Sequence, residues 1–458
     1  MQRERLGSRL GFILLSAGCA IGIGNVWKFP YMAGQYGGGA FVLVYLFFLI
    51  VMGVPVLTME FAMGRASQKS PVKLYQQLEP KGSKWHLHGY MAMIGNYLLM
   101  MFYTTVAGWM LQYFVDTASG KFVGADTAKV ASLYTDMKAD PVTMTIYMVI
   151  VVILGFLVCS IGLQKGLERI TKVMMLALLA IMAVLAVNSI FMDGGSEGLK
   201  FYLLPDFTRM QEIGIGKVIV GAMNQAFFTL SLGIGSMAIF GSYIDKKRAL
   251  MGEAVNVAVL DTSVALTSGL IIFPACFAYN VEVNSGPGLI FVTLPNIFNN
   301  IPLGRLWGSL FFVFMSFAAL STVLAVFENI ISCTTDLLGF SRKKACFVNC
   351  ILMIILSLPC VLGFNVLKGI KPLGPESDIM DFEDFLVSNI WLPVGALLFI
   401  IFCVTKYGWG WKNFVAEANE GKGFKVANWM RGYMTFVLPV MVLIIFIVGL
   451  IDVFKELL

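Results

Sequence analysis

The stretch Gly18-Cys19-Ala20-Ile21-Gly22-Ile23-Gly24-Asn25 lies in the middle of the first long apolar segment. Glycine costs about 1 kcal/mol relative to alanine inside a helix, so the closely spaced Gly22 and Gly24 predict an unwound turn. In hydrocarbon, every backbone N–H or C=O group freed by such a turn costs several kcal/mol unless it finds a partner. We therefore expect a helix that breaks inside the protein and offers carbonyl oxygens to a small cation.

A second stretch of the same kind, Thr229-Leu230-Ser231-Leu232-Gly233-Ile234-Gly235, lies inside another apolar segment far downstream. Two broken helices in corresponding halves of a chain typically mark the binding site of a secondary transporter, near the bilayer midplane. The N–H groups at such breaks favour an anionic group, and the carbonyl groups favour an ammonium or another cation. This combination suits a zwitterionic α-amino acid.

Composition indicates a polytopic, all-α membrane protein, because 58% of the 458 residues are hydrophobic and only 13% are charged. The 8 cysteines lie in apolar stretches without metal-binding spacing, so neither a disulfide framework nor a metal–thiolate site is expected. Eleven segments reach the roughly 20 residues that a bilayer requires. These segments are 10–33, 40–63, 88–115, 143–163, 169–192, 214–243, 254–280, 306–335, 344–366, 385–407 and 432–454.

The distribution of basic residues predicts the orientation of the chain. Of the 33 lysines and arginines, 22 fall on the N-terminal side of the membrane, 10 fall on the opposite side, and Lys28 lies inside a span. The positive-inside rule then predicts a cytoplasmic N-terminus and, after eleven spans, an extracytoplasmic C-terminus. Because this rule explains the net charge of +6, the charge gives no reason to expect a nucleic-acid partner.

The two halves of the chain have the same form, since spans one to five and spans six to ten each begin with a broken helix. An odd number of spans in each half implies an inverted repeat. We expect residues 1–192 to form the first half, 193–407 the second, and 408–458 a cytoplasmic loop with span eleven. The connections are too short for a catalytic domain, and the sequence contains no nucleophile–base set or phosphate-binding loop, so we expect neither an enzyme nor an organic cofactor.

Polar residues inside the spans suggest ion sites. Asp261 is a carboxylate deep in an apolar run, and Asn25 and Thr229 add oxygens at the two breaks. Hard oxygen ligands with one negative charge suit Na⁺, although Asp261 could simply bond a neighbouring helix. Ser321 and Thr322 are adjacent hydroxyls in span eight. Such hydroxyls usually bond back to their own helix, and only their occurrence together with the broken helix favours an ion site.

Two further groups of residues have competing interpretations. Tyr103 and Phe228 could form an aromatic wall around a substrate, or they could be ordinary packing. Lys28 could pair across an outer vestibule with an acidic cluster that precedes span ten. The alternative for most of that cluster is a solvated loop. Its members are Asp378, Asp381, Glu383 and Asp384.

Together these motifs resemble those of the neurotransmitter:sodium symporter family, and in particular its eleven-helix bacterial amino-acid transporters. The matching stretches run nearly end to end: 8–12, 20–25, 29–31, 37–41, 60–65, 225–235, 288–295 and 317–322. The resemblance implies the fold of the bacterial leucine transporter, which is a five-plus-five inverted repeat with helices 1 and 6 unwound, here followed by an eleventh helix. It also implies sodium-coupled uptake by alternating access, a location in a bacterial inner membrane, and a monomer or weak dimer.

The resemblance assigns site residues by position. It implies a first sodium site at Ala20, Asn25, Thr229 and Asp261, completed by the substrate carboxylate, and a second at Gly18, Ile21, Ala318, Ser321 and Thr322. The implied substrate site comprises Ala20, Gly24, Leu99, Tyr103, Phe228, Thr229, Ser231, Ile234, Thr322 and Val326. Lys28 and Asp384 resemble an outer gate, and Arg3, Ser242, Tyr243 and Asp336 resemble an inner one.

Departures from the family pattern refine the expected function. Gly22 stands where monoamine transporters have an aspartate, so the substrate should bring its own carboxylate. Asp261 replaces an asparagine usual in eukaryotic members, which suggests a fixed negative charge in place of chloride. Leu99, Ile234 and Val326 indicate an apolar or aromatic side chain on the substrate. The sequence therefore predicts a sodium-coupled importer of a hydrophobic or aromatic L-amino acid, with an amino-acid sensor of the same fold as the alternative and an uncoupled channel third.

Overall fold

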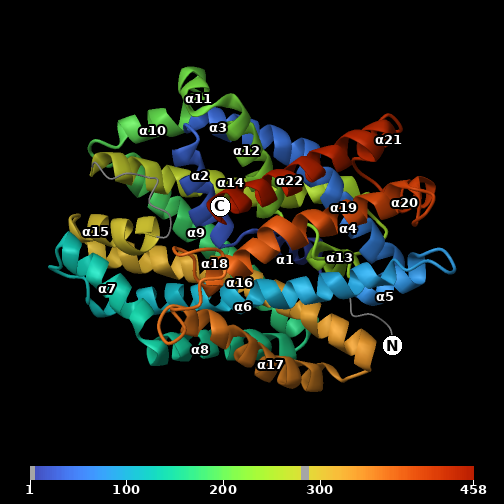
Figure 1. Cartoon of the computed structure of the whole chain (residues 1–458), viewed down its shortest axis with the longest axis horizontal. Helices are drawn as coiled ribbons and strands as arrows, with labels where there is room; N and C mark the ends of the chain where they lie inside the picture. The colour runs from blue at the N-terminus through green and yellow to red at the C-terminus, as the bar shows by residue number, and fades with distance from the viewer. Residues whose placement is uncertain (1–5, 280–287, 458) are drawn as a thin grey trace.

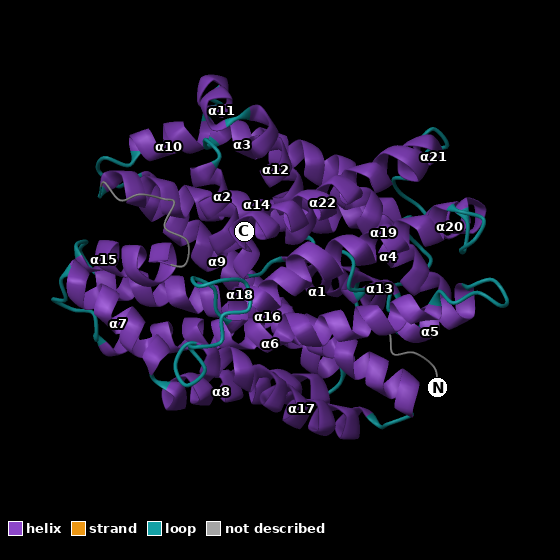
Figure 2. Cartoon of the chain, viewed as in Figure 1, coloured by secondary structure: helices purple, strands orange, loops and turns teal. Residues whose placement is uncertain are grey.

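The computed structural model describes residues 6–279 and 288–457 of the chain. The regular elements of these ranges are all helical (Figure 2). Nine helices or continuous helix runs in them are long and apolar enough to cross a membrane, and a tenth span is counted when two helices joined at a 60° bend are taken together. The expected polytopic helical architecture is confirmed.

The first five spans follow the predicted segments closely. The first is the bent pair, made of α1 (Arg9–Ala20) and a wide helical turn (Gly24–Lys28) that leads into α2 (Phe29–Gln35). The other four are α3 (Gly39–Phe48) continued by α4 (Val54–Ser67), then α6 (His86–Ser119), α8 (Pro141–Ser160) and α9 (Arg169–Ile190).

The sixth span explains why ten spans rather than eleven are counted by length. It is divided into α12 (Ile215–Thr229) and the short α13 (Ser236–Gly241), and neither part is long enough to cross a bilayer alone. The later spans are α14 (Leu250–Ala278), α16 (Gly304–Leu338), α17 (Arg342–Gly363), α18 (Ile379–Phe385) continued by α19 (Leu392–Val404), and α22 (Leu438–Leu457).

Short helices fill the connections. They are α5 (Pro71–Leu78), α7 (Thr127–Ala139), α10 (Ser196–Leu203), α11 (Phe207–Ile213), α15 (Leu294–Asn299), α20 (Trp411–Ala418) and α21 (Met430–Gly432). In Figure 1, α5 and α20 lie at the right end of the molecule, whereas α7, α10 and α15 lie at the left end. The connections that the basic residues assign to opposite sides of the membrane therefore gather at opposite ends.

Local sequence signals set several helix starts. Ser8 caps α1 by accepting a hydrogen bond from the Gly11 N–H, and Asp140 caps α8 in the same way. Pro141 at the first position of α8 removes a donor that would have no partner in the helix. The broken helix α1 and the long helices α6 and α16 run through the middle of the bundle (Figure 1), and α16 packs along both of the others. The boundaries of the two halves and the tail (1–192, 193–407 and 408–458) stay a prediction.

Candidate substrate and sodium sites

The first break lies where α1 ends. Ile21 adopts an extended conformation after Ala20, so its carbonyl group leaves the helical hydrogen-bond pattern. Two hydroxyl groups of α16 reach that carbonyl oxygen, because Ser321 Oγ and Thr322 Oγ1 each donate to it at 3.2 Å. The hydroxyl pair therefore contacts the break and does not merely bond along its own helix.

The remaining members of the predicted second sodium site belong to the same cluster. Thr322 Oγ1 also lies 3.3 Å from the carbonyl oxygen of Gly18, and Ser321 Oγ lies 2.8 Å from that of Ala318. The five predicted residues thus bring three backbone carbonyl oxygens and two hydroxyls into one buried group. A small hard cation favours oxygen ligands of this kind.

The second break is held open by unusual backbone angles. Ser231, Gly233 and Gly235 have φ values of 50°, 101° and 72°, in the left-handed region. A Cβ atom on Gly233 would lie 2.2 Å from the carbonyl oxygen of Leu392, so this position accepts only glycine on steric grounds as well. The chain between α12 and α13 therefore cannot continue as a regular helix.

Buried polar side chains from three other helices satisfy the groups freed by the second break. Glu60 on α4 accepts a hydrogen bond from the Gly233 N–H at 2.7 Å. Asn96 on α6 donates to the carbonyl oxygen of Ile234 at 2.8 Å, and Asn329 on α16 donates to the Asn96 side-chain oxygen at 2.9 Å. The sequence analysis did not assign Glu60, Asn96 or Asn329, although a polar residue inside an apolar span is the signal that points to them.

Asp261 joins the two breaks. The Asn25 amide nitrogen donates to Asp261 Oδ1 at 2.8 Å, and the Thr229 hydroxyl donates to Asp261 Oδ2 at 3.0 Å. Asn25 Nδ2 also lies 3.1 Å from the Thr229 hydroxyl oxygen. Asp261 is fully buried, and no basic side chain in the described ranges forms an ion pair with it. Three of the four residues predicted for the first sodium site therefore bond one another directly.

A small cavity lies between the breaks. Its volume of about 30 Å³ has room for about two water molecules, so an amino acid requires it to expand. Eight of the ten predicted substrate residues line it, namely Ala20, Gly24, Leu99, Tyr103, Phe228, Thr229, Ser231 and Thr322. Ile234 and Val326 are fully buried but are not part of its wall. Cys19, Gly22 and Leu392 line the cavity in addition, and Leu392 carries no sequence signal because it is one leucine in an apolar span.

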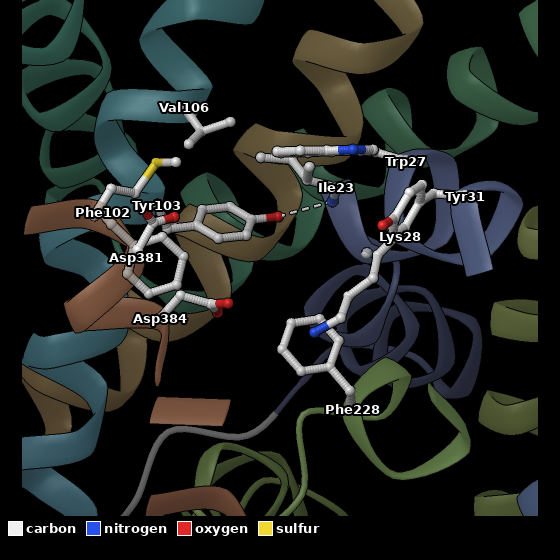
Figure 3. A pocket seen from close by; sticks show the side chains of 12 residues that line it. Ile23, Trp27, Lys28, Tyr31, Phe102, Tyr103, Val106, Phe228, Asp381 and Asp384 are labelled. Atoms are coloured by element: carbon white, nitrogen blue, oxygen red, sulfur yellow. Dashed lines mark hydrogen bonds between the residues drawn. The ribbon is translucent and has the colours of Figure 1, made fainter. Parts of the chain in front are cut away.

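Tyr103 closes the cavity beside the first break. Its hydroxyl oxygen accepts a hydrogen bond from the Ile23 N–H at 3.1 Å (Figure 3), so one N–H freed by the break is satisfied by α6. A Cβ atom on Gly22 would lie only 2.4 Å from that hydroxyl oxygen and 2.7 Å from Thr322 Oγ1. A side chain at this position would therefore require Tyr103, Thr322 or the first break to shift.

A larger cavity of about 390 Å³ adjoins the small one, since Tyr103, Phe228 and Gly24 line both. Lys28 and Asp384 face each other across it (Figure 3). The structure shows no ion pair between these two described residues. The Lys28 ammonium lies 3.8 Å from the centre of the Phe228 ring, and Asp384 Oδ1 accepts a hydrogen bond from Ser388 at 2.7 Å. The outer gate stays a prediction, and in this structure Lys28 and Asp384 each contact a different residue.

The predicted inner gate is only partly covered, because Arg3 lies outside the described residues. The Tyr243 hydroxyl donates to Glu328 Oε1 at 2.6 Å, and Glu328 also pairs with Arg342. Ser242 Oγ donates to the Ile239 carbonyl oxygen at 2.6 Å. Asp336 Oδ2 accepts from the Ser70 N–H at 2.7 Å. The pairing of these residues with Arg3 stays a prediction.

The sequence matches the model of the sodium:neurotransmitter symporter family over residues 3–128 and 127–457. The chain belongs to this family. One relative is a sodium-dependent transporter of Bacillus subtilis (strain 168), which is 35% identical to this chain over 96% of each sequence. The sodium- and chloride-dependent taurine transporter of Homo sapiens is 25% identical, over 98% of this chain and 78% of the relative.

A solved structure extends the comparison to the fold. The crystal structure of MhsT in complex with L-phenylalanine matches with a TM-score of 0.87 and 35% sequence identity, over 98% of this chain and 100% of that chain. The expected leucine-transporter fold is thereby confirmed. This family member is a multi-pass, sodium-dependent membrane transporter.

Proposed function

We propose that the chain imports a hydrophobic or aromatic L-amino acid together with Na⁺ by alternating access. One observation carries this proposal: Asp261 is fully buried, and the side chains that donate hydrogen bonds to its carboxylate are the neutral Asn25 and Thr229. A buried carboxylate without a cationic partner is costly, and a bound Na⁺ would remove that cost. The similarity to a protein crystallised with L-phenylalanine supports the substrate class.

The residues have distinct roles in this proposal. One Na⁺ would bind among Ala20, Asn25, Thr229 and Asp261, with the Asn25 amide turning its oxygen toward the ion. A second would bind among the Gly18, Ile21 and Ala318 carbonyl oxygens and the Ser321 and Thr322 hydroxyls. The substrate carboxylate would lie at the first break, next to the first Na⁺ and within reach of the Tyr103 hydroxyl.

Binding would prepare the transporter for closure. Filling the ion sites fixes the two broken helices against α14 and α16, and this completes the substrate cavity. Phe228 would then cover the substrate from the outer cavity. Lys28 would leave the Phe228 ring to pair with Asp384. The membrane potential contributes about 2.3 kcal/mol per sodium charge per 100 mV to inward movement.

Orientation and location are part of the same proposal. The N-terminus would lie in the cytoplasm and the C-terminus outside, in a bacterial inner membrane, with the protein as a monomer or weak dimer. The side of the membrane with most basic residues would be cytoplasmic.

Uptake into proteoliposomes tests the proposal. Labelled leucine, phenylalanine, tyrosine and tryptophan would be offered with an inward Na⁺ gradient, with K⁺ replacing Na⁺ as the control, and with chloride replaced by gluconate. We expect concentrative uptake of at least one of the four that requires Na⁺ and does not require chloride. Saturable binding without gradient-driven accumulation would instead favour an amino-acid sensor.

A further inference from the structure

A surface groove lies where α6 begins, away from the substrate path. It has a volume of about 430 Å³ and is lined by Lys84, Trp85, Leu87, His88, Met91 and Leu398. All but Leu398 come from the start of α6 and the turn before it, and Leu398 comes from α19. The groove lies in the connection that the basic residues place on the cytoplasmic side of the membrane.

His88 gives the groove a polar wall. The side chain is 5% exposed, and its ring packs edge-on against Phe399 with the ring centres 4.9 Å apart. Its Nδ1 lies 2.6 Å from the Tyr75 hydroxyl oxygen, whereas its Nε2 has no hydrogen-bond partner in the described part of the chain. When the Tyr75 hydroxyl donates to Nδ1, the proton of His88 resides on Nε2, which is buried behind the groove wall and reaches an anion only when that wall moves aside. A buried donor without a partner is unfavourable, so a ligand that accepts its hydrogen bond would stabilise this part of the protein.

The charge at the groove is positive. Lys84 is exposed, and no carboxylate within the described ranges forms an ion pair with it. The nearby acid Glu79 is already engaged, because its carboxylate binds His86 Nδ1 at 2.8 Å and the His86 N–H at 3.0 Å. The groove therefore offers an exposed ammonium to an anion, with a buried imidazole nitrogen behind its wall.

The surroundings of the groove have the character of a membrane interface. The Trp85 indole N–H donates to the Tyr407 carbonyl oxygen at 2.7 Å, and the Lys406 ammonium lies 5.3 Å from the Tyr407 ring centre. Tryptophan, tyrosine and lysine gather at the headgroup level of membrane proteins. From this level an exposed apolar stripe continues along α6 into the membrane, with Leu87, Tyr90 and Ile94 at 58%, 41% and 52% exposure. Their spacing of three and four residues places them on one face of the helix.

We propose that this groove is a binding site for one anionic phospholipid. The phosphate group would bind Lys84 Nζ and, once the side chains that cover it move aside, His88 Nε2. An acyl chain would lie along the apolar stripe of α6. Charge complementarity selects an anionic headgroup, and the stripe selects a lipid over a soluble anion. The site touches the start of α6, the same helix that carries Tyr103, so an occupied groove would hold that helix in place.

Native mass spectrometry of the purified full-length chain tests this site. The protein would be titrated with phosphatidylglycerol or phosphatidylcholine of identical acyl chains. We expect one phosphatidylglycerol to bind more tightly than phosphatidylcholine. In Lys84→Ala the affinity for phosphatidylglycerol should fall about fivefold, the usual contribution of one lysine at an anionic surface. His88→Phe keeps the ring against Phe399 and should show a similar loss.

Lys343→Ala is the matched control, because Lys343 is an exposed lysine on the same predicted side and does not line the groove. Its affinity for phosphatidylglycerol should equal that of the unmodified protein. Equal binding of the two lipids, or equal losses in Lys84→Ala and Lys343→Ala, would overturn the proposal. Competition by inorganic phosphate at similar concentrations would overturn it as well, since the groove would then be a site for a soluble anion. If His88→Phe does not fold, the two lysine variants still decide the question.

Discussion

The ammonium nitrogen of Lys28 lies 3.8 Å from the centre of the Phe228 ring, whereas Asp384 faces the same cavity without pairing with Lys28. A cation over an aromatic face gains about 0.5–2 kcal/mol, which is similar to the gain from a partly exposed ion pair. Lys28 can therefore exchange one partner for the other at little net cost. This is a useful property for a residue that must move at each transport cycle.

The first prediction concerns that exchange. Asp384→Asn removes the charge that would attract Lys28 when the outer cavity closes, so closure should become less favourable. We expect the uptake rate in proteoliposomes to fall about fivefold, because a partly exposed ion pair contributes up to about 1 kcal/mol. Equilibrium substrate binding should change much less. Asp381→Asn, which changes a second carboxylate of the same cavity, is the control, and an equal loss in both variants would argue against a specific partner for Lys28.

A second prediction follows from the space around Gly22. The added methyl group of Gly22→Ala would lie 2.4 Å from the Tyr103 hydroxyl oxygen, so either Tyr103 or the first break must shift. Saturable substrate binding should be lost or weakened at least a hundredfold, while the protein remains folded in detergent. Gly216→Ala is the control, because a methyl group there meets nothing within 4 Å and lies in the helix α12. That variant should bind normally and gain up to about 1 kcal/mol of stability. Normal binding by Gly22→Ala would contradict the proposed substrate position.

The third prediction concerns the fixed charge of Asp261. Asp261→Asn keeps the size of the side chain and removes the negative charge beside the first predicted sodium site. The sodium affinity should fall at least tenfold in gluconate, and added chloride should restore part of the uptake. Glu253→Gln is the matched control, since Glu253 is a buried carboxylate of the same helix that pairs with Arg9 at 3.0 Å. If both variants acquired the same chloride response, Asp261 would not be the charge that replaces chloride.

The fourth prediction concerns a buried cation at the opposite end of the molecule. Arg65 is almost fully buried, and its guanidinium donates to Glu417 Oε1 at 2.6 Å and to the Arg248 carbonyl oxygen at 2.7 Å. It thereby joins the end of α4 to two connections that are distant in the sequence. Arg65→Ala should lower the free energy of unfolding by about 3–5 kcal/mol, because it leaves Glu417 buried without its main partner.

Thermal unfolding in detergent would measure this loss. Lys200→Met is the control, since Lys200 pairs with Glu197 at the surface, where both side chains are more than half exposed. We expect a change of less than about 1 kcal/mol there. Similar shifts in both variants would mean that Arg65 contributes no more than an ordinary surface pair.

The sequence by itself determined the class of the protein, the spans and the two breaks. Hydropathy and glycine residues determine the local conformation of the chain, so spans and breaks can be predicted from them without knowledge of the fold. The sequence also predicted the chemical type of the polar groups near the two breaks. Burying an aspartate or a pair of hydroxyls inside an apolar span costs free energy wherever that span packs. The sequence alone therefore indicated Asp261, Ser321 and Thr322 as candidate site residues.

Only the tertiary structure decided which groups meet. Glu60, Asn96 and Asn329 support the second break from three different helices, and neither spacing nor composition relates them to it. Leu392 lines the small cavity although Ile234 and Val326 do not. The physical reason is that these contacts join positions more than a hundred residues apart in several cases, through helix rotations that depend on the packing of the whole bundle. The partner of Lys28 was decided in the same way, because the helical turn Gly24–Lys28 places the ammonium next to Phe228 of α12.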